Sequence, residues 1–341
     1  MTARPQRPAA RRAPASEPGP KRPAARRASA SKAGVEVEVG GRRLVLKNLD
    51  KVFYPEAGFT KGDVVDYYAR IAPALLPHLA GRPLTMKRYP EGVEGMFFYE
   101  KRCPPHRPEW VHTAKVWSER NDEFIDYCVV NDLPSLIWAA SIADLELHTS
   151  LSLAHAIDTP TTIVFDLDPG PPADVVTCCD VALLVRKLLH RLELEVYPKT
   201  SGSKGLQLYV PLGGRATYDE TKPFAHAVAQ VLERGHPKLV VERMKKDLRV
   251  GKVLVDWSQN DPHKTTVSVY SLRARARPTV SAPVTWAEVE KAARTRRGDG
   301  LVLEAKDVLR RVERMGDLFE PVLTRRQRLP GPDGVERVRL S

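Results

Sequence analysis

Two aspartates that could hold a metal ion, Asp166 and Asp168, end the apolar segment TTIVFDLD and are followed at once by Pro-Gly-Pro. In a β-strand, side chains at positions i and i+2 point to the same face, so both carboxylates are expected side by side at the rim of a sheet. They repel each other unless a cation lies between them, and an oxygen-only site suits Mg²⁺ or Mn²⁺. A solvated acidic loop, an aspartyl phosphatase and a sugar transferase are alternatives that this pattern alone leaves open.

A glycine-rich turn, KTSGSKG over residues 199–205, supplies groups that suit a phosphate. The backbone N–H groups of such a turn can point at an anion, Ser201 and Ser203 add hydroxyl donors, and Lys204 adds a positive charge. The turn is not a P-loop, because the sequence lacks the GxxxxGK[ST] pattern. An ordinary β-turn is the alternative.

A third carboxylate, Asp256, ends the apolar segment VLVDW. Together with the first two aspartates it completes the ligand set of a two-metal site. In such a site, ions about 4 Å apart stabilise the attacking and leaving oxygens of phosphoryl transfer. On its own, an aspartate in this place is more typical of a cap or a turn.

The segments around these residues predict alternating strands and helices in the centre of the chain. Expected strands are TTIVFDLD, LEVYPKT, GLQLYVPL, KVLVDW and TTVSVYSLRAR, and expected helices are DVVTCCDVALLVRKLLHRL, residues 219–234, TWAEVEKAA and AKDVLRRVERM. Nearer the N-terminus, VEVEVGGRRLVL predicts a hairpin. Thr60 precedes an amphipathic helix that Pro73 is expected to kink or break. The fold class is therefore α/β or α+β, with acids and loops meeting at strand ends.

The chain carries a net charge of +12, and most of it lies at the N-terminus. Residues 1–33 contain nine Lys and Arg against the single acid Glu17, which leaves +8 in this segment. Residues 1–34 lack apolar periodicity and are expected to be disordered, as a nucleic-acid-binding arm or a merely solubilising tail. One domain is expected over residues 35–325, followed by a flexible tail over residues 326–341.

Four cysteines, Cys103, Cys128, Cys178 and Cys179, show no CxxC spacing. A buried reduced thiol is expected for each, which favours a cytosolic protein without a zinc site. No apolar run approaches the roughly 20 residues of a spanning helix. The basic N-terminus is not followed by the apolar core of a secretory signal. The expected location is the cytoplasm, in association with the nucleoid, and no membrane partner is expected.

Four motifs in chain order, DLDPG, TSGSKGLQLYVPL, GKVLVDWSQN and YSLRAR, resemble the polymerase domain of bacterial end-joining ligase D proteins, which belongs to the archaeo-eukaryotic primase superfamily. The resemblance runs over roughly residues 40–320 and includes NLDKVFYPEAGFTKGDVVDYYARIAP and GRPLTMKRYPEGVEGMFFYEK. It implies a primase-like catalytic core with a central mixed or antiparallel sheet flanked by helices, together with an N-terminal hairpin and helix. A polymerase site in a basic groove is also implied.

The resemblance further implies roles for individual residues. Two divalent ions, Mn²⁺ by preference or Mg²⁺, would be held by Asp166, Asp168 and Asp256. The residues expected to bind the incoming nucleotide are Lys87, His148, Ser201, Lys204, Gln207 and Arg273. Those expected to bind DNA are Lys51 and Lys61, as a pocket for a 5′-phosphate, with Arg88, Phe97, Phe98 and Arg249. Without the resemblance, these lysines could be surface residues, the arginines ion-pair partners and the histidine structural. One of the two phenylalanines is expected in the core, because neighbours in a strand face opposite sides.

Two positions depart from the family pattern. The second motif of the family reads SGxKGxH, and here Gln207 replaces its histidine, which is a residue near the phosphates of the nucleotide. The family often has LHPW where this chain has LHTS at residues 147–150. A neutral amide donates a weaker hydrogen bond to a phosphate than an imidazolium does. Weaker nucleotide binding or slower chemistry, by about tenfold or more, is therefore expected, and complete loss of activity is the alternative.

The expected function is metal-dependent nucleotidyl transfer that extends or fills DNA ends in bacterial non-homologous end joining, with ribonucleotides preferred. No KxDG adenylation motif occurs, so a free-standing polymerase module is expected. Its expected partners are 5′-phosphorylated DNA, NTP or dNTP, Ku and a separate ligase. A degenerate module that binds and bridges DNA ends without synthesis is the main alternative. A phosphatase of the haloacid-dehalogenase type fits poorly, because that fold has Gly-Thr where this chain has Pro-Gly-Pro.

Overall fold

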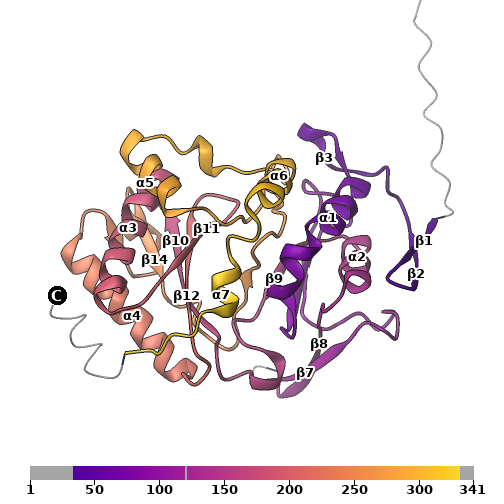
Figure 1. Ribbon diagram of the computed structural model, residues 1–341, viewed down its shortest axis with the longest axis horizontal. Helices are drawn as coiled ribbons and strands as arrows, with labels where there is room; N and C mark the ends of the chain where they lie inside the picture. The colour runs from indigo at the N-terminus through magenta and orange to yellow at the C-terminus, as the bar shows by residue number, and fades with distance from the viewer. Residues whose placement is uncertain (1–33, 120, 331–341) are drawn as a thin grey trace, which may run out of the picture. The chain divides into compact units, whose positions relative to one another are not determined.

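The computed structural model describes residues 34–119 and 121–330 of the chain. Two β-sheets organise these residues (Figure 1). A six-stranded sheet takes most of its strands from the N-terminal half, and a five-stranded sheet comes from residues 162–256. The parts of the two predicted tails at residues 1–33 and 331–341 lie outside the described residues.

The five-stranded sheet has the strand order β11-β12-β10-β14-β13. Its strands are β10 (Thr162–Pro169), β11 (Tyr197–Thr200), β12 (Leu206–Pro211), β13 (Val240–Val241) and β14 (Val253–Asp256). All neighbours pair antiparallel except β13 and β14, so the sheet is mixed. To one side of it lie α3 (Val175–Arg191), α4 (Tyr218–Gly235) and α5 (Trp286–Thr295), as Figure 1 shows.

Alternation along β10 decides which side chains face these helices. Ile163, Phe165 and Leu167 are fully buried and share a hydrophobic core with the inner sides of α3 and α4. Burying each of these side chains contributes about 1.5–3 kcal/mol, which fixes the face that the strand turns inward. Because successive side chains of a strand alternate, Asp166 and Asp168 point to the opposite face.

The six-stranded sheet has the order β15-β9-β5-β8-β7, and β6 also pairs with β5. Its strands are β5 (Leu84–Arg88), β6 (Phe98–Glu100), β7 (Thr113–Ser118), β8 (Glu123–Cys128), β9 (Asp144–Thr149) and β15 (Thr266–Val267). A second hydrophobic core joins this sheet to the helices α1 (Lys61–Leu79), α2 (Leu133–Ser141) and α6 (Ala305–Met315). A short helix, α7 (Glu320–Thr324), follows α6.

The predicted N-terminal hairpin is confirmed as β1 (Val35–Val39) and β2 (Arg42–Leu46). Its turn residues, Gly40 and Gly41, have φ of 55° and 73°. Positive φ at both central positions is the type I′ geometry that matches the twist of a hairpin and favours glycine. A smaller pair, β3 (Val52–Tyr54) and β4 (Phe59–Thr60), leads into α1.

Helix α1 begins at the predicted capping residue but does not end at Pro73. Thr60 and Asp63 form a capping box, and the helix continues through Pro73 and Pro77 to Leu79. An interior proline removes one backbone hydrogen bond and costs about 3 kcal/mol. Burial of a long apolar face, which includes the fully buried Tyr68, offsets that cost. The predicted helix is therefore confirmed, and of the kink or break expected at Pro73, the break is wrong.

The expected strand TTVSVYSLRAR is also wrong, because only β15 forms within it. The chain leaves the sheet, and Tyr270 adopts the left-handed conformation with φ of 64°. Side chains hold this turn: the Tyr67 hydroxyl donates to the Tyr270 carbonyl at 2.8 Å, and the Tyr270 hydroxyl donates to Asp317 at 2.6 Å. Tertiary hydrogen bonds thus override a β-branched sequence.

Two of the four cysteines are not free thiols. Cys103 and Cys128 form a disulfide with a Cα–Cα distance of 4.9 Å, which corrects the prediction of a reduced thiol at each position. Cys178 and Cys179, which belong to α3, are free and buried in the core, as predicted. Among the described residues, no helix is long and apolar enough to cross a membrane.

Candidate active site

A row of four polar side chains crosses the five-stranded sheet on one face. The strand register places Lys199 of β11 opposite Gln207 of β12. It places Gln207 opposite Asp166 of β10, which in turn lies opposite Asp256 of β14. Directly opposite residues have Cβ atoms about 4.5–5.5 Å apart, and Asp168 follows on the same face two residues along β10. The sheet therefore brings together the three carboxylates that the sequence predicted as one site.

The electrostatics of Asp166 are those of a crowded carboxylate. Burial raises the pKa of Asp166 to about 6, and the carboxylates of Asp256 and Asp168 act in the same direction. Lys199 and a hydrogen bond from Gln207 act in the opposite direction. A cluster of like charges is unfavourable for a folded chain by itself, and a divalent cation would remove the repulsion.

The other two carboxylates have hydrogen-bond partners. Asp256 accepts from the backbone N–H of Ser258 at 2.9 Å and from its hydroxyl at 2.7 Å, and also from Gln259 Nε2 at 2.8 Å. Asp168 pairs with Arg249 at 3.2 Å. In residues 34–119 and 121–330, no three His, Cys, Asp or Glu side chains already converge on one point as ligands. The three aspartates fit a divalent ion in type and in their shared face, and each carboxylate has more acceptor positions than the hydrogen bonds described use.

The turn that carries Asp256 is fixed by Asn260, which is fully buried. Its Oδ1 accepts from the Val164 N–H at 2.9 Å, and its Nδ2 donates to the Val164 carbonyl at 2.8 Å. The side chain therefore continues the backbone pairing of β10 beyond the end of β14. This holds Asp256 level with Asp166 across the sheet.

The glycine-rich loop is held by its own hydrogen bonds. The Ser201 Oγ accepts from the N–H groups of Ser203 at 3.2 Å and Gly205 at 3.1 Å, and the Ser201 N–H donates to the Gly205 carbonyl at 2.9 Å. Gly205 packs so closely on β10 that a Cβ would lie 1.9 Å from the Leu167 carbonyl oxygen. These three amides point inward, so the expected backbone cradle for a phosphate is not formed by them. Lys204 is exposed and has no ion-pair partner in the described part of the chain.

A buried carboxylate, Glu146 of β9, organises the cationic wall that faces the aspartates. It lies 3.1 Å from His148 Nε2, 3.3 Å from Arg273 Nε and 3.4 Å from Lys87 Nζ, and it accepts from the Ala274 N–H at 2.9 Å. Burial raises the pKa of Glu146, but the hydrogen bond from His148, together with Arg273, holds it well below its ordinary value. Burial lowers the pKa of His148.

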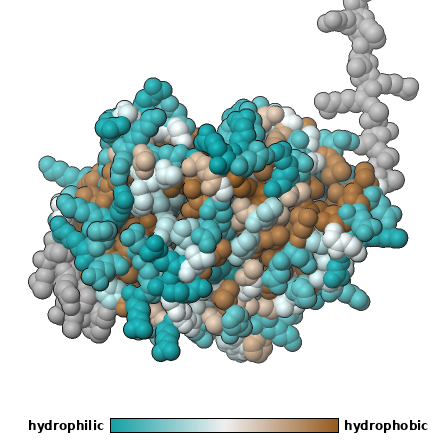
Figure 2. Space-filling view, in the orientation of Figure 1, coloured by the Kyte–Doolittle hydropathy of each residue, from teal (hydrophilic) through white to brown (hydrophobic). Residues whose placement is uncertain are grey.

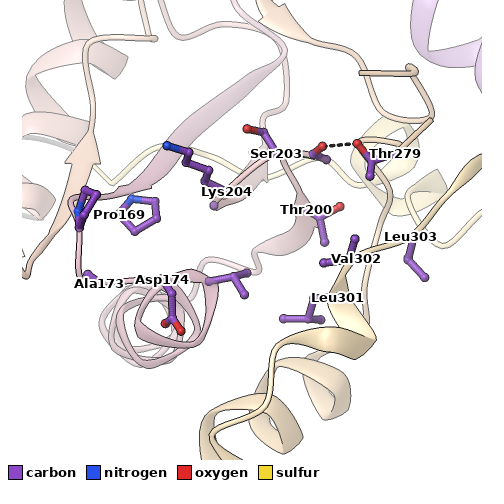
Figure 3. A pocket seen from close by; sticks show the side chains of 14 residues that line it. Pro169, Ala173, Asp174, Thr200, Ser203, Lys204, Thr279, Leu301, Val302 and Leu303 are labelled. Atoms are coloured by element: carbon purple, nitrogen blue, oxygen red, sulfur yellow. Dashed lines mark hydrogen bonds between the residues drawn. The ribbon is translucent and has the colours of Figure 1, made fainter. Parts of the chain in front are cut away.

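A cavity of about 480 Å³ lies between the aspartates and this wall. The predicted site residues that line it are Asp166, Asp168, Asp256, His148, Ser201, Lys204, Gln207, Arg249 and Arg273. A second cavity, of about 310 Å³, lies on the other side of the glycine-rich loop between Pro169 and Leu303 (Figure 3). Lys204 borders both cavities.

The two predicted aromatic residues lie beside different cations: Phe97 beside Lys87, and Phe98 beside Arg88, whose guanidinium carbon is 5.2 Å from its ring centroid. Lys87 Nζ is 4.6 Å from the ring centroid of Phe97, and 5.3 Å and 5.4 Å from those of Tyr89 and Tyr99, within the range of cation–π attraction. Phe97 is 50% and Phe98 43% exposed, so the prediction that one of them belongs to the core is wrong. The reason is that β6 begins only at Phe98, so the two residues are not neighbours within one strand.

Four predicted cations, Lys51, Lys61, Lys87 and Arg88, are not among the lining of the 480 Å³ cavity. Lys51 pairs with Glu91 at 2.6 Å, and Arg88 pairs with Glu100 at 2.6 Å. Lys61 is buried and donates to a backbone carbonyl at 2.9 Å. Burial lowers the pKa of Lys61, and Lys51 and Arg88 act in the same direction, so the three cations repel one another.

Sequence reasoning assigned no role to Glu146 or Lys199. A signal for Glu146 was available, because Asp144, Glu146 and His148 alternate in DLELH and must share one face of a strand. Lys199 carried no comparable signal, because it is a lysine next to a polar loop, and its complete burial depends on residues 267 and 281.

Comparison with known proteins agrees with this geometry. The family model of the LigD primase-polymerase domain matches residues 60–319. The chain belongs to the LigD primase-polymerase family. The resemblance noted in the sequence is therefore confirmed, as is the mixed sheet flanked by helices.

Three relatives illustrate the match. The multifunctional non-homologous end joining protein LigD of Mycolicibacterium smegmatis is 44% identical over 283 residues, which are 82% of this chain and 36% of that protein. The bifunctional LigD of Bacillus subtilis is 32% identical over 252 residues, 73% of this chain and 40% of that protein. The polymerase domain from Mycobacterium tuberculosis ligase D, solved in complex with DNA, has 40% identity and a TM-score of 0.76, and the match covers 84% of this chain and 99% of that domain. The chain thus spans a little over a third of the curated LigD relatives.

Proposed function

We propose that this LigD primase-polymerase adds nucleotides to DNA ends by nucleotidyl transfer that depends on two divalent ions. The observation that carries the proposal is the gathering of Asp166, Asp168 and Asp256 on one sheet face beside a cationic wall. Mn²⁺ or Mg²⁺ held by these residues would stabilise the charge that develops on the transferring phosphate. DNA is the proposed substrate because the similar polymerase domain of M. tuberculosis ligase D was solved in complex with DNA.

The residues around the aspartates bind and orient the nucleotide in this proposal. Lys204, Arg273 and Lys87 neutralise the triphosphate, and His148, Ser201 and Gln207 donate hydrogen bonds to it or to its ribose. A ribonucleotide preference is proposed, because the Ser201 hydroxyl keeps its proton available as a donor while its oxygen accepts two backbone amides. Gln207 lowers the rate relative to a histidine, since a neutral amide binds anions less strongly.

DNA binds next to these groups in the proposal. Lys51 and Lys61 hold the 5′-phosphate of the downstream strand, which would relieve the repulsion between these buried or half-buried cations. Phe97 and Phe98 expose enough ring surface to stack on bases, a contact worth about 1–3 kcal/mol for each base. Arg88 and Arg249 contact the template and the DNA near the ions. Ku and a separate ligase are the proposed partners, in the cytoplasm near the nucleoid.

A primer-extension assay tests the proposal. The substrate is a gapped duplex with a 5′-phosphate, supplied with Mn²⁺ and either rNTPs or dNTPs, and the proteins are wild type, Asp166→Ala and Gln207→His. Extension by the wild type that disappears in Asp166→Ala supports the proposal, and Gln207→His is expected to extend about tenfold faster. Wild type that binds the duplex tightly but adds no nucleotide contradicts it.

That contradicting outcome would favour the second candidate, an end-binding module without synthesis. Three observations favour it: the oxygens of Asp256 already accept hydrogen bonds, Asp168 forms an ion pair with Arg249, and position 207 is a glutamine. In this candidate, Lys51 and Lys61 still bind a 5′-phosphate. The extension assay separates the two functions, because only the polymerase lengthens the primer.

A further inference from the structure

The row of side chains across the sheet ends in a lysine with no exposed surface. Lys199 is fully buried, and its ammonium group donates to Gln207 Oε1, to Ser281 Oγ at 2.6 Å and to the Val267 carbonyl at 3.1 Å. An ammonium group has three N–H donors, so all three are used. None of the three acceptors is a carboxylate. A buried cation without an acid partner is costly for the folded chain, which points to a role other than stability.

The lysine decides how the amide of Gln207 is oriented. An ammonium group only donates, so the amide group must turn its oxygen, Oε1, towards Lys199. The NH₂ group of an amide lies on the other branch, and on that side Asp166 faces Gln207 directly across the strand pair. The strand register therefore leaves Nε2 of Gln207 on the side of the Asp166 carboxylate.

The donor and acceptor of this amide also strengthen each other. A donor that binds the oxygen of an amide withdraws electron density from its nitrogen, and hydrogen bonds in series polarise one another. The positive charge on Lys199 therefore reaches Asp166 through Gln207, although Gln207 itself is neutral.

We propose that Lys199 is a positioning residue that acts through Gln207: by binding Oε1, it directs Nε2 at Asp166 and fixes that carboxylate for the metal ion. The inference rests on the proposed function, in which Asp166 is a metal ligand. Ser281 is part of the same device, because its hydroxyl accepts from Lys199 and donates to the Thr200 carbonyl at 2.9 Å. Asp166 has a second neighbour across the sheet, Asp256, which lies on the side away from Gln207.

A double-mutant cycle tests this inference with the full chain. The proteins are wild type, Lys199→Met, Gln207→Ala and the double variant. The measurements are the Kd for Mn²⁺ by calorimetry without DNA, and kcat and KM for nucleotide incorporation. With Gln207 present, Lys199→Met is expected to raise the Kd for Mn²⁺ and to lower kcat by about tenfold each, the scale of one hydrogen bond to a charged group. In the Gln207→Ala background the same change is expected to have less than about twofold effect.

Two further variants show whether the effects of the cycle come from a general loss of stability in the variants. Ser281→Ala removes one acceptor of Lys199 without touching Gln207, so it is expected to shift the same two quantities two- to threefold, again only when Gln207 is present. Ser152→Ala removes a buried hydrogen bond to Tyr218 far from the row in sequence. It is expected to lower the Tm while leaving kcat and the Kd for Mn²⁺ unchanged.

The outcomes separate this inference from the proposed function. Effects of Lys199→Met that are equally large with and without Gln207 would overturn the inference, because Lys199 would then act independently of Gln207. A wild type that adds no nucleotide would overturn the proposed function, while the Mn²⁺ cycle would still decide whether Lys199 acts through Gln207.

Discussion

Glu146 illustrates how one buried carboxylate can assemble a cationic wall at the scale of single residues. The cations Lys87 and Arg273 would repel each other without an anion between them, and both lie, with His148, within 3.4 Å of its carboxylate. Of the three, His148 and Arg273 line the 480 Å³ cavity, where a triphosphate would add further negative charge. Glu146 therefore sets the positions of cations rather than contacting the reaction itself.

Glu146→Gln is expected to weaken nucleotide binding. The amide keeps one acceptor and the shape of the side chain but loses the charge that holds Arg273 and His148. Hydrogen bonds to charged groups contribute about 1.5–3 kcal/mol each, so the KM for the nucleotide is expected to rise about tenfold or more. Steady-state extension at varied nucleotide and fixed saturating DNA measures this.

The matched control for that variant is Glu100→Gln, which removes the charge from the partner of Arg88 on the same sheet. It is expected to leave the KM for the nucleotide unchanged, because its partner Arg88 does not line the cavity, whereas Arg273 and His148, the partners of Glu146, do. Equal effects of the two variants would mean that Glu146 acts only through the general stability of the sheet.

At the scale of elements, local patterns predicted most strands and helices, and tertiary contacts decided the exceptions. The alternation in TTIVFDLD predicted β10 and the shared face of its aspartates, because one buried face is enough to define a strand. The continuation of α1 through Pro73 and the turn at Tyr270 could not be predicted, since both depend on partners far along the chain. The site shows the same division. The aspartates could be predicted from the sequence, whereas the burial of Lys199 could not, because it depends on the distant residue 281.

One of these long-range contacts makes stability depend on pH. Asp317 binds His78 of α1 at 2.8 Å and accepts from the Tyr270 hydroxyl at 2.6 Å. Burial raises the pKa of Asp317, but these hydrogen bonds bring it below its ordinary value of 3.8. A depressed carboxyl pKa contributes stability that is present above the unfolded value and lost as the pH falls through the folded value.

Asp317→Asn is therefore expected to lower the free energy of unfolding by roughly 1–3 kcal/mol at pH 7. The difference from wild type is expected to shrink as the pH falls below 3.8 and to vanish once the pH is below the lower folded-state pKa, where the wild-type carboxyl is protonated as well. Urea unfolding across this pH range measures both. As a control, Asp66→Asn removes an exposed carboxylate that lies 3.8 Å from Arg70, and little change is expected. A loss of stability that is the same at every pH would contradict the argument.

At the scale of the whole molecule, charge is divided unevenly along the chain. Residues 1–33 carry +8 of the net +12, which leaves +4 for the rest of the sequence. Within the described residues, many cations pair with acids, as Lys51 does with Glu91 and Arg88 with Glu100. The N-terminal segment contains a single acidic residue, Glu17, so most of the positive charge of this segment is available to a polyanion.

Deleting residues 1–33 is expected to weaken DNA binding and to make it less sensitive to salt. Each phosphate contact of a duplex contributes about −0.9 to the slope of log K against log salt concentration. Losing nine cations should therefore reduce the steepness of that slope by several units. Fluorescence anisotropy with a labelled gapped duplex at several salt concentrations measures it. A version with the same residues in scrambled order is expected to bind as the wild type does, because charge and not sequence carries the effect. An unchanged slope after deletion would assign DNA affinity to the cations of the folded domain, with Lys51, Lys61 and Lys204 as the first to test.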